Sequence, residues 1–239
     1  MARLFEHTAM DSADSLRERV YRFLEDAVCS GRIPDGGFLD QDKLCETLGV
    51  SRTPLRDALI RLEAEGIVTI KSRKGVFVTP VSDAFVKSAC QILGALESDC
   101  LQVVFPKITS KNIMKMEESI NRQEALLRAH RFADYCAENN IFHDLFLNLS
   151  DNGLMRETVS LLRRRLAIIP EHPLSCDQAC CAVIDHRRIV ESLKMGNPTA
   201  AASILRHERW SPSRLLRPKI GKKRSGSVQK HPAEQSSAA

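Results

Sequence analysis

Residues 49–56 constrain the fold of this chain more than any other segment, and they read Gly-Val-Ser-Arg-Thr-Pro-Leu-Arg. They follow a short apolar-patterned helix over residues 43–48 and begin a longer one. Gly49 suits a tight turn, Ser51 suits an N-cap, and Pro54 falls in the first helical turn, where its missing N–H does no harm. A short helix, a tight turn and a second helix with basic and hydroxyl residues in its first turns are typical of a helix-turn-helix.

The second helix has one face suited to DNA and another suited to a core. Arg52 and Arg56 are four residues apart and share a face, with Thr53 beside them. Arginine is the side chain best suited to bidentate contact with guanine, and it can also hold a phosphate. The apolar stripe has helical spacing and ends at a glycine that can stop the helix in a left-handed conformation: Leu55, Leu59, Leu62, Gly66.

A β-hairpin is predicted directly after this helix. Residues 67–79 alternate around Lys71-Ser72-Arg73-Lys74-Gly75, which gives two short strands and a basic turn, or wing. The alternative is an ordinary helical hairpin beside a surface β-hairpin. The order of the elements, with basic residues at both DNA-facing places, favours a winged helix-turn-helix.

The charge distribution agrees with a DNA-binding role once it is divided by region. Residues 1–50 carry 6 Lys and Arg against 10 Asp and Glu, whereas residues 51–80 carry 6 against 3. The basic excess therefore lies on the second helix and the wing. Residues 211–239 carry 7 basic and 1 acidic residue and few apolar ones, so we expect a disordered tail that solubilises the chain or adds weak DNA affinity.

Length and composition favour two domains in a cytoplasmic protein. No apolar run is long enough to span a bilayer, and the first residues lack the apolar core of a signal peptide, so we expect no membrane partner. Residues 1–15 are expected to be flexible. The 8 cysteines form no CxxC pair and are interpreted as reduced, buried or incidental thiols rather than as a metal or redox site.

Beyond Pro80 the strand pattern ends and apolar residues recur at three- and four-residue steps. We predict an all-helical bundle over residues 81–210. Capping and turn signals divide it into six helices, over residues 83–104, 111–129, 131–149, 152–168, 177–195 and 198–210.

Polar residues on the apolar faces of this bundle are candidates for a binding site. Asn139 and His143 are four apart and share a face, His186 lies within an apolar stripe, and His207 lies in line with Ile204 and Trp210. Such residues need partners. A divalent metal is one common partner, and imidazole and carbonyl ligands suit Zn²⁺, Ni²⁺, Fe²⁺ or Mn²⁺. The alternative is that each histidine is a hydrogen-bonded core residue.

The segment over residues 16–80 resembles the winged helix-turn-helix of GntR-type bacterial transcription regulators. The resemblance rests on Gly31-Arg32-Ile33-Pro34 and on the run from Leu44 to Leu59. It implies that Arg52, Thr53 and Arg56 contact double-stranded DNA and that Gly75 lets the wing approach the minor groove. With the N-cap position Ser51 and the wing residue Lys74, these form the predicted DNA-binding set.

The bundle resembles the FCD-type effector domain of FadR-like members of that family. The matching segments are Asn139 to Phe146, Ser150 to Leu154, Asp185 to Leu193 with Gly196 to Ala201, and His207. The resemblance implies one metal per chain, held by Asn139, His143, His186 and His207. It therefore predicts a mainly α protein in which three helices and a β-hairpin wing precede an effector-binding bundle.

Two positions depart from the family pattern. Asn139 stands where Asp is common, so a dication would be held less tightly. The segment over residues 91–97 lacks the arginine that often precedes its Leu-Glu pair and serves an anionic effector. Arg163, Arg164 or Arg165 could supply that charge, although a solvated face or a dimer surface is their default interpretation.

The sequence thus predicts a homodimeric repressor that binds an inverted-repeat operator and responds to a small metabolite, in our interpretation a carboxylate that completes the metal's coordination. One alternative is a regulator for which the metal is the signal. The other is a three-histidine metal enzyme. We predict no enzyme, because the candidate bases Glu138, Asp144 and Asp185 are adjacent in sequence to proposed ligands and should face away from the metal.

Overall fold

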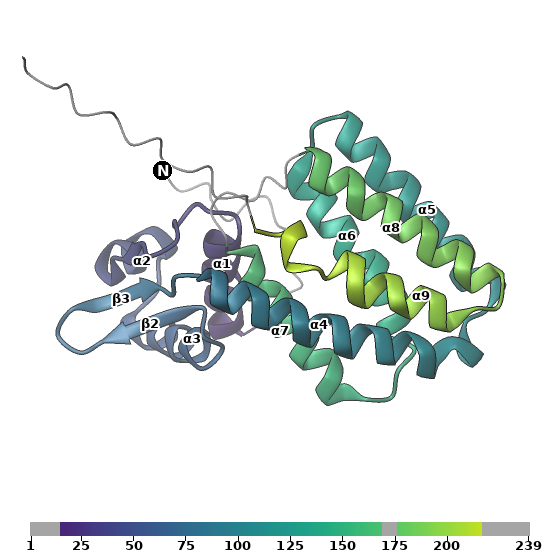
Figure 1. Ribbon diagram of the computed structural model, residues 1–239. Helices are drawn as coiled ribbons and strands as arrows, with labels where there is room; N and C mark the ends of the chain where they lie inside the picture. The colour runs from purple at the N-terminus through teal and green to yellow at the C-terminus, as the bar shows by residue number, and fades with distance from the viewer. Residues whose placement is uncertain (1–14, 169–175, 217–239) are drawn as a thin grey trace, which may run out of the picture.

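The computed structural model describes residues 15–168 and 176–216, which form a small N-terminal domain and a helical bundle (Figure 1). The flexible segment predicted over residues 1–15 and the tail predicted over 211–239 fall almost entirely outside the described residues. No helix in the described ranges combines the length and apolar character needed to cross a membrane. The cysteines whose side chains are described form no disulfide.

The N-terminal domain has the predicted winged helix-turn-helix order. Its elements are α1 (Leu16–Cys29), β1 (Phe38–Leu39), α2 (Gln41–Leu48), α3 (Arg52–Ala64), β2 (Val68–Lys71) and β3 (Gly75–Val78). The predicted stripe of α3 is buried, with Leu55, Leu59 and Leu62 at most 2% exposed. These side chains pack with Leu24 of α1 and Val76 of the wing in one core. Burial of that core orients α3 with its polar face outward.

Two glycines make the turns on either side of α3. Gly49 ends α2 with φ 61°, and Gly66 follows α3 with φ 72°, so both occupy the left-handed region that glycine adopts without strain. Ser51 is the N-cap residue of α3 in an extended conformation, as predicted. Its hydroxyl, however, accepts no backbone N–H, which leaves it available to another partner.

The sheet has a third strand that the sequence pattern did not predict. β1 pairs antiparallel with β3, and the strand order is β1-β3-β2. β1 is only two residues long, so it is too short to show an alternating pattern. Phe38 of β1 lies opposite Phe77 of β3, and the centroids of their rings are 5.4 Å apart. β1 therefore closes the free edge of β3 and anchors the base of the wing.

The predicted helices of the bundle are confirmed, and their ends lie within one or two residues of the predicted positions. The elements are α4 (Asp83–Val104), a 3₁₀ turn (Phe105–Lys107), α5 (Ser110–Arg128), α6 (Phe132–Leu147), α7 (Gly153–Ala167), α8 (Cys176–Lys194), α9 (Pro198–Ile204), a π-helical turn η2 (Leu205–Arg209) and a 3₁₀ turn (Pro212–Arg214). The exception is the last predicted helix, which is α-helical only to Ile204 and then continues as the π turn.

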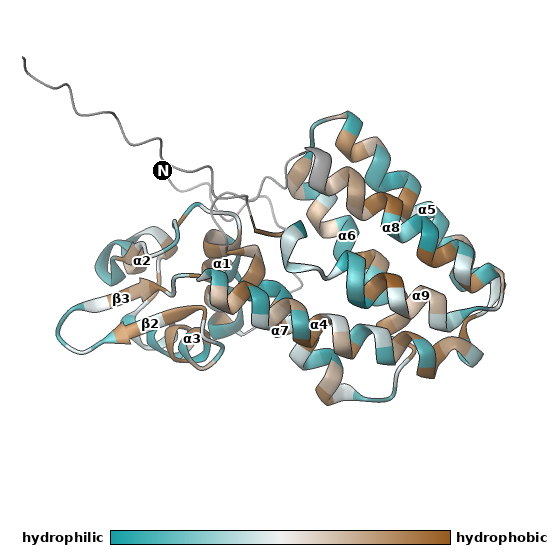
Figure 2. Cartoon of the chain, in the orientation of Figure 1, coloured by the Kyte–Doolittle hydropathy of each residue, from teal (hydrophilic) through white to brown (hydrophobic). Residues whose placement is uncertain are grey.

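The bundle core is aromatic at its centre. Tyr135, Phe142 and Phe146 of α6 are fully buried and pack with Leu93 of α4 and Trp210. Hydrophobic and hydrophilic residues alternate around the bundle helices, as expected for helices with one buried and one exposed face (Figure 2). α6 thereby places its polar residues Asn139 and His143 close to the core.

The two domains meet where α1 lies beside α7 (Figure 1). Ile168, at the end of α7, is 2% exposed and belongs to the core of the N-terminal domain. Arg164 forms ion pairs with Glu25 of α1, at 3.0 Å, and with Glu65 after α3, at 3.3 Å. The guanidinium carbon of Arg165 lies 3.9 Å from the centroid of the Phe85 ring. α7 therefore contacts both the bundle and the domain that carries α3.

Candidate DNA interface and buried polar network

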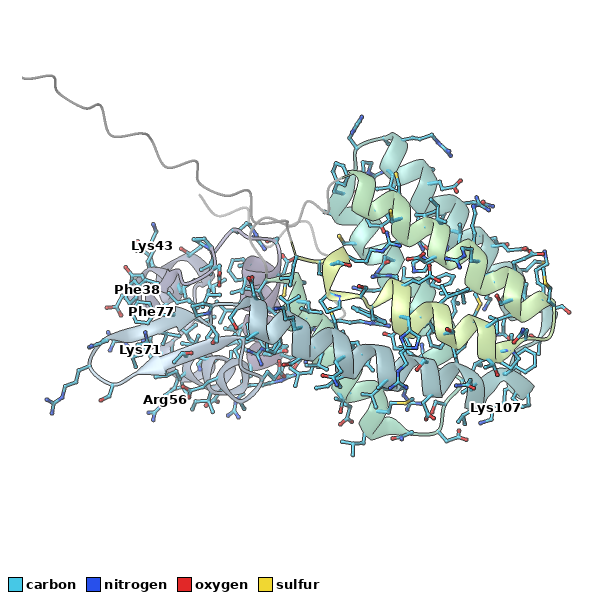
Figure 3. All side chains as sticks on the ribbon, in the orientation of Figure 1. Phe38, Lys43, Arg56, Lys71, Phe77 and Lys107 are labelled. Atoms are coloured by element: carbon cyan, nitrogen blue, oxygen red, sulfur yellow. The ribbon has the colours of Figure 1, made fainter. Side chains whose placement is uncertain are left out.

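The DNA-facing surface predicted from sequence is exposed in the structure. Ser51, Arg52, Thr53 and Arg56 are all exposed on α3. Arg52 forms an ion pair of 2.7 Å with Asp42 of α2, between two side chains that are both largely exposed. Arg56 has no hydrogen-bond or ion-pair partner among the described residues. Figure 3 shows Arg56 and Lys71 at the end of the molecule opposite the bundle.

The wing carries the other predicted contacts. Lys71, Arg73 and Lys74 are exposed around its turn, and Arg73 has φ 60°. Gly75 has φ 101°, and a Cβ atom added to it would lie 2.5 Å from a ring carbon of Phe38. Glycine at this position is therefore required by the wing's own fold. Whether it also approaches the minor groove stays a prediction.

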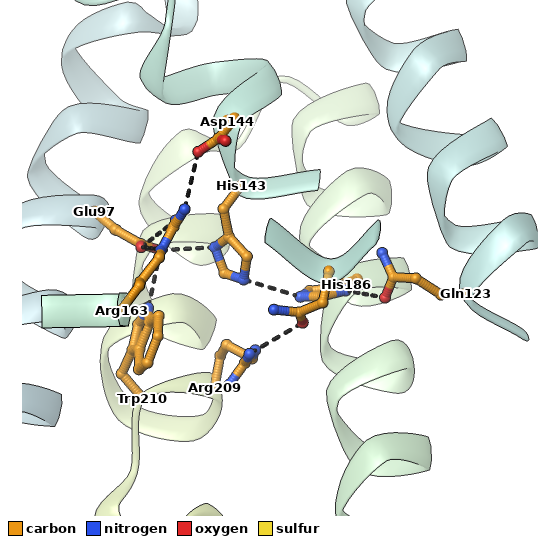
Figure 4. A network of polar contacts seen from close by, with 9 residues as sticks. Glu97, Gln123, His143, Asp144, Arg163, His186, Arg209 and Trp210 are labelled. Carbon is orange, nitrogen blue, oxygen red and sulfur yellow. Dashed lines mark hydrogen bonds and ion pairs between the residues drawn. The ribbon is translucent and has the colours of Figure 1, made fainter. Parts of the chain in front are cut away.

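Glu97 of α4 is the centre of a buried polar network (Figure 4). Its side chain is 0% exposed. Its carboxylate accepts hydrogen bonds from Arg163 of α7, at 2.5 and 3.1 Å, and from Trp210 Nε1, at 2.9 Å. His143 Nδ1 lies 2.7 Å from the same carboxylate. Burial alone would raise the pKa of Glu97, but the Arg163 guanidinium and these hydrogen bonds hold that pKa below its usual range.

The two buried histidines of the network lie against each other. His143 and His186 are both fully buried, and their Nε2 atoms are 3.3 Å apart. Burial lowers the pKa of His143 to about 4, although the Glu97 carboxylate opposes that shift, and burial also lowers the pKa of His186. Both imidazoles are therefore neutral near pH 7.

Neither histidine of this pair has a proton to donate to the other. An ionised Glu97 requires a proton on Nδ1 of His143, which leaves a lone pair on its Nε2. The Oε1 atom of Gln123 lies 3.0 Å from Nδ1 of His186 and imposes the same tautomer there. Two lone pairs then face each other across 3.3 Å. Either the Gln123 amide is turned round, or a cation lies between the rings.

The geometry fits the predicted metal centre in part. Two nitrogen ligands of a tetrahedral ion, each about 2.0–2.1 Å from it, stand roughly 3.3–3.4 Å apart. The Nε2 atoms of His143 and His186 have this separation, and their Nδ1 atoms contact Glu97 and Gln123, as in metal sites whose histidines are oriented by polar partners. However, no group of three or more His, Cys, Asp or Glu side chains within the described ranges is arranged to hold an ion.

The other two predicted ligands lie elsewhere. The prediction that His207 faces inward is wrong, because its side chain is exposed on the π turn. A π turn advances more residues per turn than an α-helix, so it presents Arg209 and Trp210 to the interior instead. Asn139 is half-buried, and its Oδ1 atom accepts a hydrogen bond of 3.1 Å from Arg209 Nη2. The structure therefore brings together His143 and His186 and leaves His207 apart.

Sequence reasoning missed the remaining members of the network. Glu97 and Gln123 have no spacing that marks them as partners of histidines on other helices. The default assignment of Arg163 to a solvated or dimer surface is wrong, because its side chain is 8% exposed and pairs with Glu97 and Asp144. The alternative, that Arg163 supplies charge to an anionic effector, stays a prediction. Of the other nominated carboxylates, Glu138 pairs with Arg122 and Asp185 with Arg214.

Comparison with known families agrees with both halves of this architecture. The profile of the bacterial regulatory proteins of the gntR family matches residues 16–78, and the profile of the FCD domain matches residues 89–208. The second match alone covers half of the chain. This chain belongs to the GntR family and carries an FCD domain. It is a DNA-binding transcriptional regulator and not an enzyme.

Individual relatives support the same assignment. The regulator is 24% identical over 156 residues to the HTH-type transcriptional repressor RspR of Escherichia coli K12, covering 65% of this chain and 68% of that protein. It is 24% identical over 197 residues to a probable D-xylose utilization operon transcriptional repressor of Paenarthrobacter nicotinovorans. This match covers 81% of this chain and 85% of that protein. The solved structure of E. coli McbR/YncC superposes with a TM-score of 0.69 at 18% identity, covering 80% of this chain and 92% of that one, and so shares the fold.

Proposed function

We propose that this regulator is a homodimeric repressor that binds an inverted-repeat operator and releases it when a small carboxylate binds the bundle. The exposed face of α3 supports the DNA contact, because Arg56 and its neighbours are free of the core. A two-fold operator follows from the dimer, since two recognition helices related by two-fold symmetry read two half-sites. A repressor of this kind acts on the chromosome, so we place it in the cytoplasm.

The observation that carries the proposed control is the position of Arg163 and Arg164 in α7. Arg163 pairs with the buried carboxylate of Glu97, at the centre of the polar network. Arg164, the next residue, pairs with Glu25 and Glu65 of the DNA-binding domain. A ligand that binds one arrangement of the network better than another would shift α7, and with it the domain that carries α3.

Selection of bound sequences from random duplex DNA, followed by footprinting, tests the DNA-binding part of this proposal. We expect two half-sites in inverted orientation, with centres about one helical turn apart or a multiple of it. Sedimentation of the complex should give two chains per DNA. Recovery of a single half-site bound by one chain would contradict the homodimer.

A divalent metal between His143 and His186 is part of the proposal, supported by their facing Nε2 atoms. Elemental analysis of the purified regulator should give about one transition metal per chain. The His143→Ala and His186→Ala variants should lose it, while His130→Ala, which changes an exposed histidine, should retain it. Retention of metal in His207→Ala would remove that residue from the ligand set. Absence of metal from the parent, even after reconstitution, would make the pair core residues.

The facing Nε2 atoms also favour a second candidate function, in which the metal itself is the signal. Operator affinity of the metal-stripped regulator, measured without and with Zn²⁺, Ni²⁺, Fe²⁺ or Mn²⁺ and then with carboxylates, separates the two. A metal sensor changes its affinity for the operator with the metal alone. A metabolite sensor needs the carboxylate as well.

A further inference from the structure

Phe38 of β1 places an aromatic ring at the surface, beside the wing. The residue is 57% exposed, whereas every other Phe, Tyr or Trp residue in the described ranges is half-buried or buried. The next residue, Leu39, is 1% exposed and faces the core, so Phe38 lies on the outer face of the sheet. A single exposed apolar side chain needs no explanation by itself. The contacts of this ring with the wing, however, point to a role for it.

The Phe38 ring begins a row of side chains that crosses the outer face of the sheet. Its centroid lies 5.4 Å from that of Phe77 on β3, and Lys71 Nζ on β2 lies 5.0 Å from the centroid of the Phe77 ring. Both separations are typical of favourable aromatic and cation–π pairs. Figure 3 shows Phe38, Phe77 and Lys71 at the same end of the molecule as Arg56. The row therefore joins all three strands on the face opposite the core.

The same ring covers Gly75, the first residue of β3. Phe38 lies opposite Phe77, and Gly75 is two residues earlier in the strand, so its missing side chain would share the outer face. The three atoms nearest to a Cβ added at residue 75 all belong to Phe38, the closest at 2.5 Å. Glycine weakens a strand, and an aromatic side chain on a neighbouring strand can compensate for it. The Phe38 ring fills the place of the side chain that Gly75 lacks.

The tip of the wing has no comparable support from the core. The core of the N-terminal domain includes Val68, Val76 and Val78 but none of residues 71–75. Residues 71–74 are all exposed, and Lys71 with Gly75 is the last pair of the ladder between β2 and β3. The direction of the turn is therefore set by the strand segment at Gly75, on which the Phe38 ring packs.

We propose that Phe38 is a positioning residue for the wing, whose ring packs on Gly75 and Phe77 and holds the turn over residues 72–74 in the orientation that meets DNA. Gly75 then leaves the backbone open to close approach, while β1 supplies the rigidity that a glycine forfeits. A wing held in place before binding loses less conformational freedom on the operator. The effect on operator affinity rests on the wing contact expected for the proposed function, whereas the effect on the rigidity of the wing does not.

The first test measures amide hydrogen exchange of the full chain without DNA, by mass spectrometry of peptides from residues 67–79 and from α1 and α3. Phe38→Ala should speed exchange in the wing about threefold to tenfold, because loss of the ring contacts favours local opening. Phe38→Leu keeps apolar bulk without the ring and should behave in the same way, whereas Phe38→Tyr keeps the ring and should match the parent. Leu16→Ala, which changes a 48% exposed residue of α1, is the control and should leave the wing unchanged.

Two outcomes of the exchange experiment would overturn the proposal. One is unchanged exchange in the wing of Phe38→Ala, which would mean that the ring does not brace Gly75. The other is an equal increase in the wing, α1 and α3, which would mean that Phe38 stabilises the whole domain rather than the wing.

The second test compares footprints of the parent and Phe38→Ala on the selected operator. Phe38→Ala should bind about threefold to tenfold more weakly. It should lose hydroxyl-radical protection of the minor groove at the wing, while guanines in the major groove beneath α3 stay protected from methylation. Loss of protection in both grooves, or weaker binding without faster exchange in the wing, would overturn the proposal, the latter because Phe38 would then contact DNA itself. Absence of minor-groove protection in the parent would contradict the wing contact and leave the exchange experiment to decide the role of Phe38.

Discussion

Replacing Glu97 with alanine is expected to lower the free energy of unfolding by about 3–5 kcal/mol. The substitution leaves the guanidinium of Arg163 buried without its main counter-charge. It also removes the acceptor of Trp210 Nε1 and the partner of His143 Nδ1. Urea unfolding followed by far-UV circular dichroism measures the change, because the bundle supplies most of the helical signal.

Asp99→Ala is the matched control for this experiment, since it removes an exposed carboxylate two residues further along α4. Its effect should stay within about 0.5 kcal/mol of the parent. Glu97→Gln retains an acceptor and should fall between the two variants. If Glu97→Ala matched Asp99→Ala, the carboxylate would not be holding Arg163, and the proposed link between the network and α7 would fail.

The sequence predicted the elements because their signals are local. The α3 stripe repeats every three or four residues, and Gly49 and Gly66 mark the turns on either side. The bundle helices are delimited by residues that cap them, such as Thr109, whose side chain accepts from the N–H of Asn112 in a capping box. Such signals depend on residues a few positions apart, so a single sequence displays them.

The network was only partly predictable because its contacts are distant in sequence. Glu97 and Arg163 are 66 residues apart, and His186 and Gln123 are 63 apart, so no spacing joins them. His143 and His186 were identified as polar residues on apolar helix faces. This pattern predicts that a side chain is buried, but it does not identify the residue that the side chain contacts. His207 was misplaced because the prediction assumed an α-helix to residue 210, whereas the π turn rotates every side chain that follows Leu205.

Arg163, Arg164 and Arg165 show how one short segment serves two domains. Successive residues of an α-helix point about 100° apart, so three neighbouring arginines reach three different surroundings: the buried carboxylate of Glu97, the acidic pair Glu25 and Glu65, and the ring of Phe85. The segment that the sequence suggested as a solvated face therefore links the polar network to the DNA-binding domain.

Arg56→Ala is expected to weaken operator binding by about tenfold to a hundredfold while leaving the fold intact. Arg56 is exposed and has no hydrogen-bond or ion-pair partner among the described residues, so its loss should cost the protein little stability. Arg52 is a less decisive position, because its ion pair with Asp42 competes with DNA. Fluorescence anisotropy with labelled operator measures the loss, and Arg128→Ala, an exposed arginine of the bundle, is the control.

The salt dependence of the same experiment separates two roles for Arg56. A phosphate contact would weaken binding to operator and unrelated DNA alike and would reduce the slope of log affinity against log salt by about 1. A guanine contact would weaken operator binding selectively, and the variant would tolerate a changed base at one position of each half-site. Unchanged affinity for operator at all salt concentrations would remove Arg56 from the interface and would leave the reading of bases to Arg52, Thr53 and the wing.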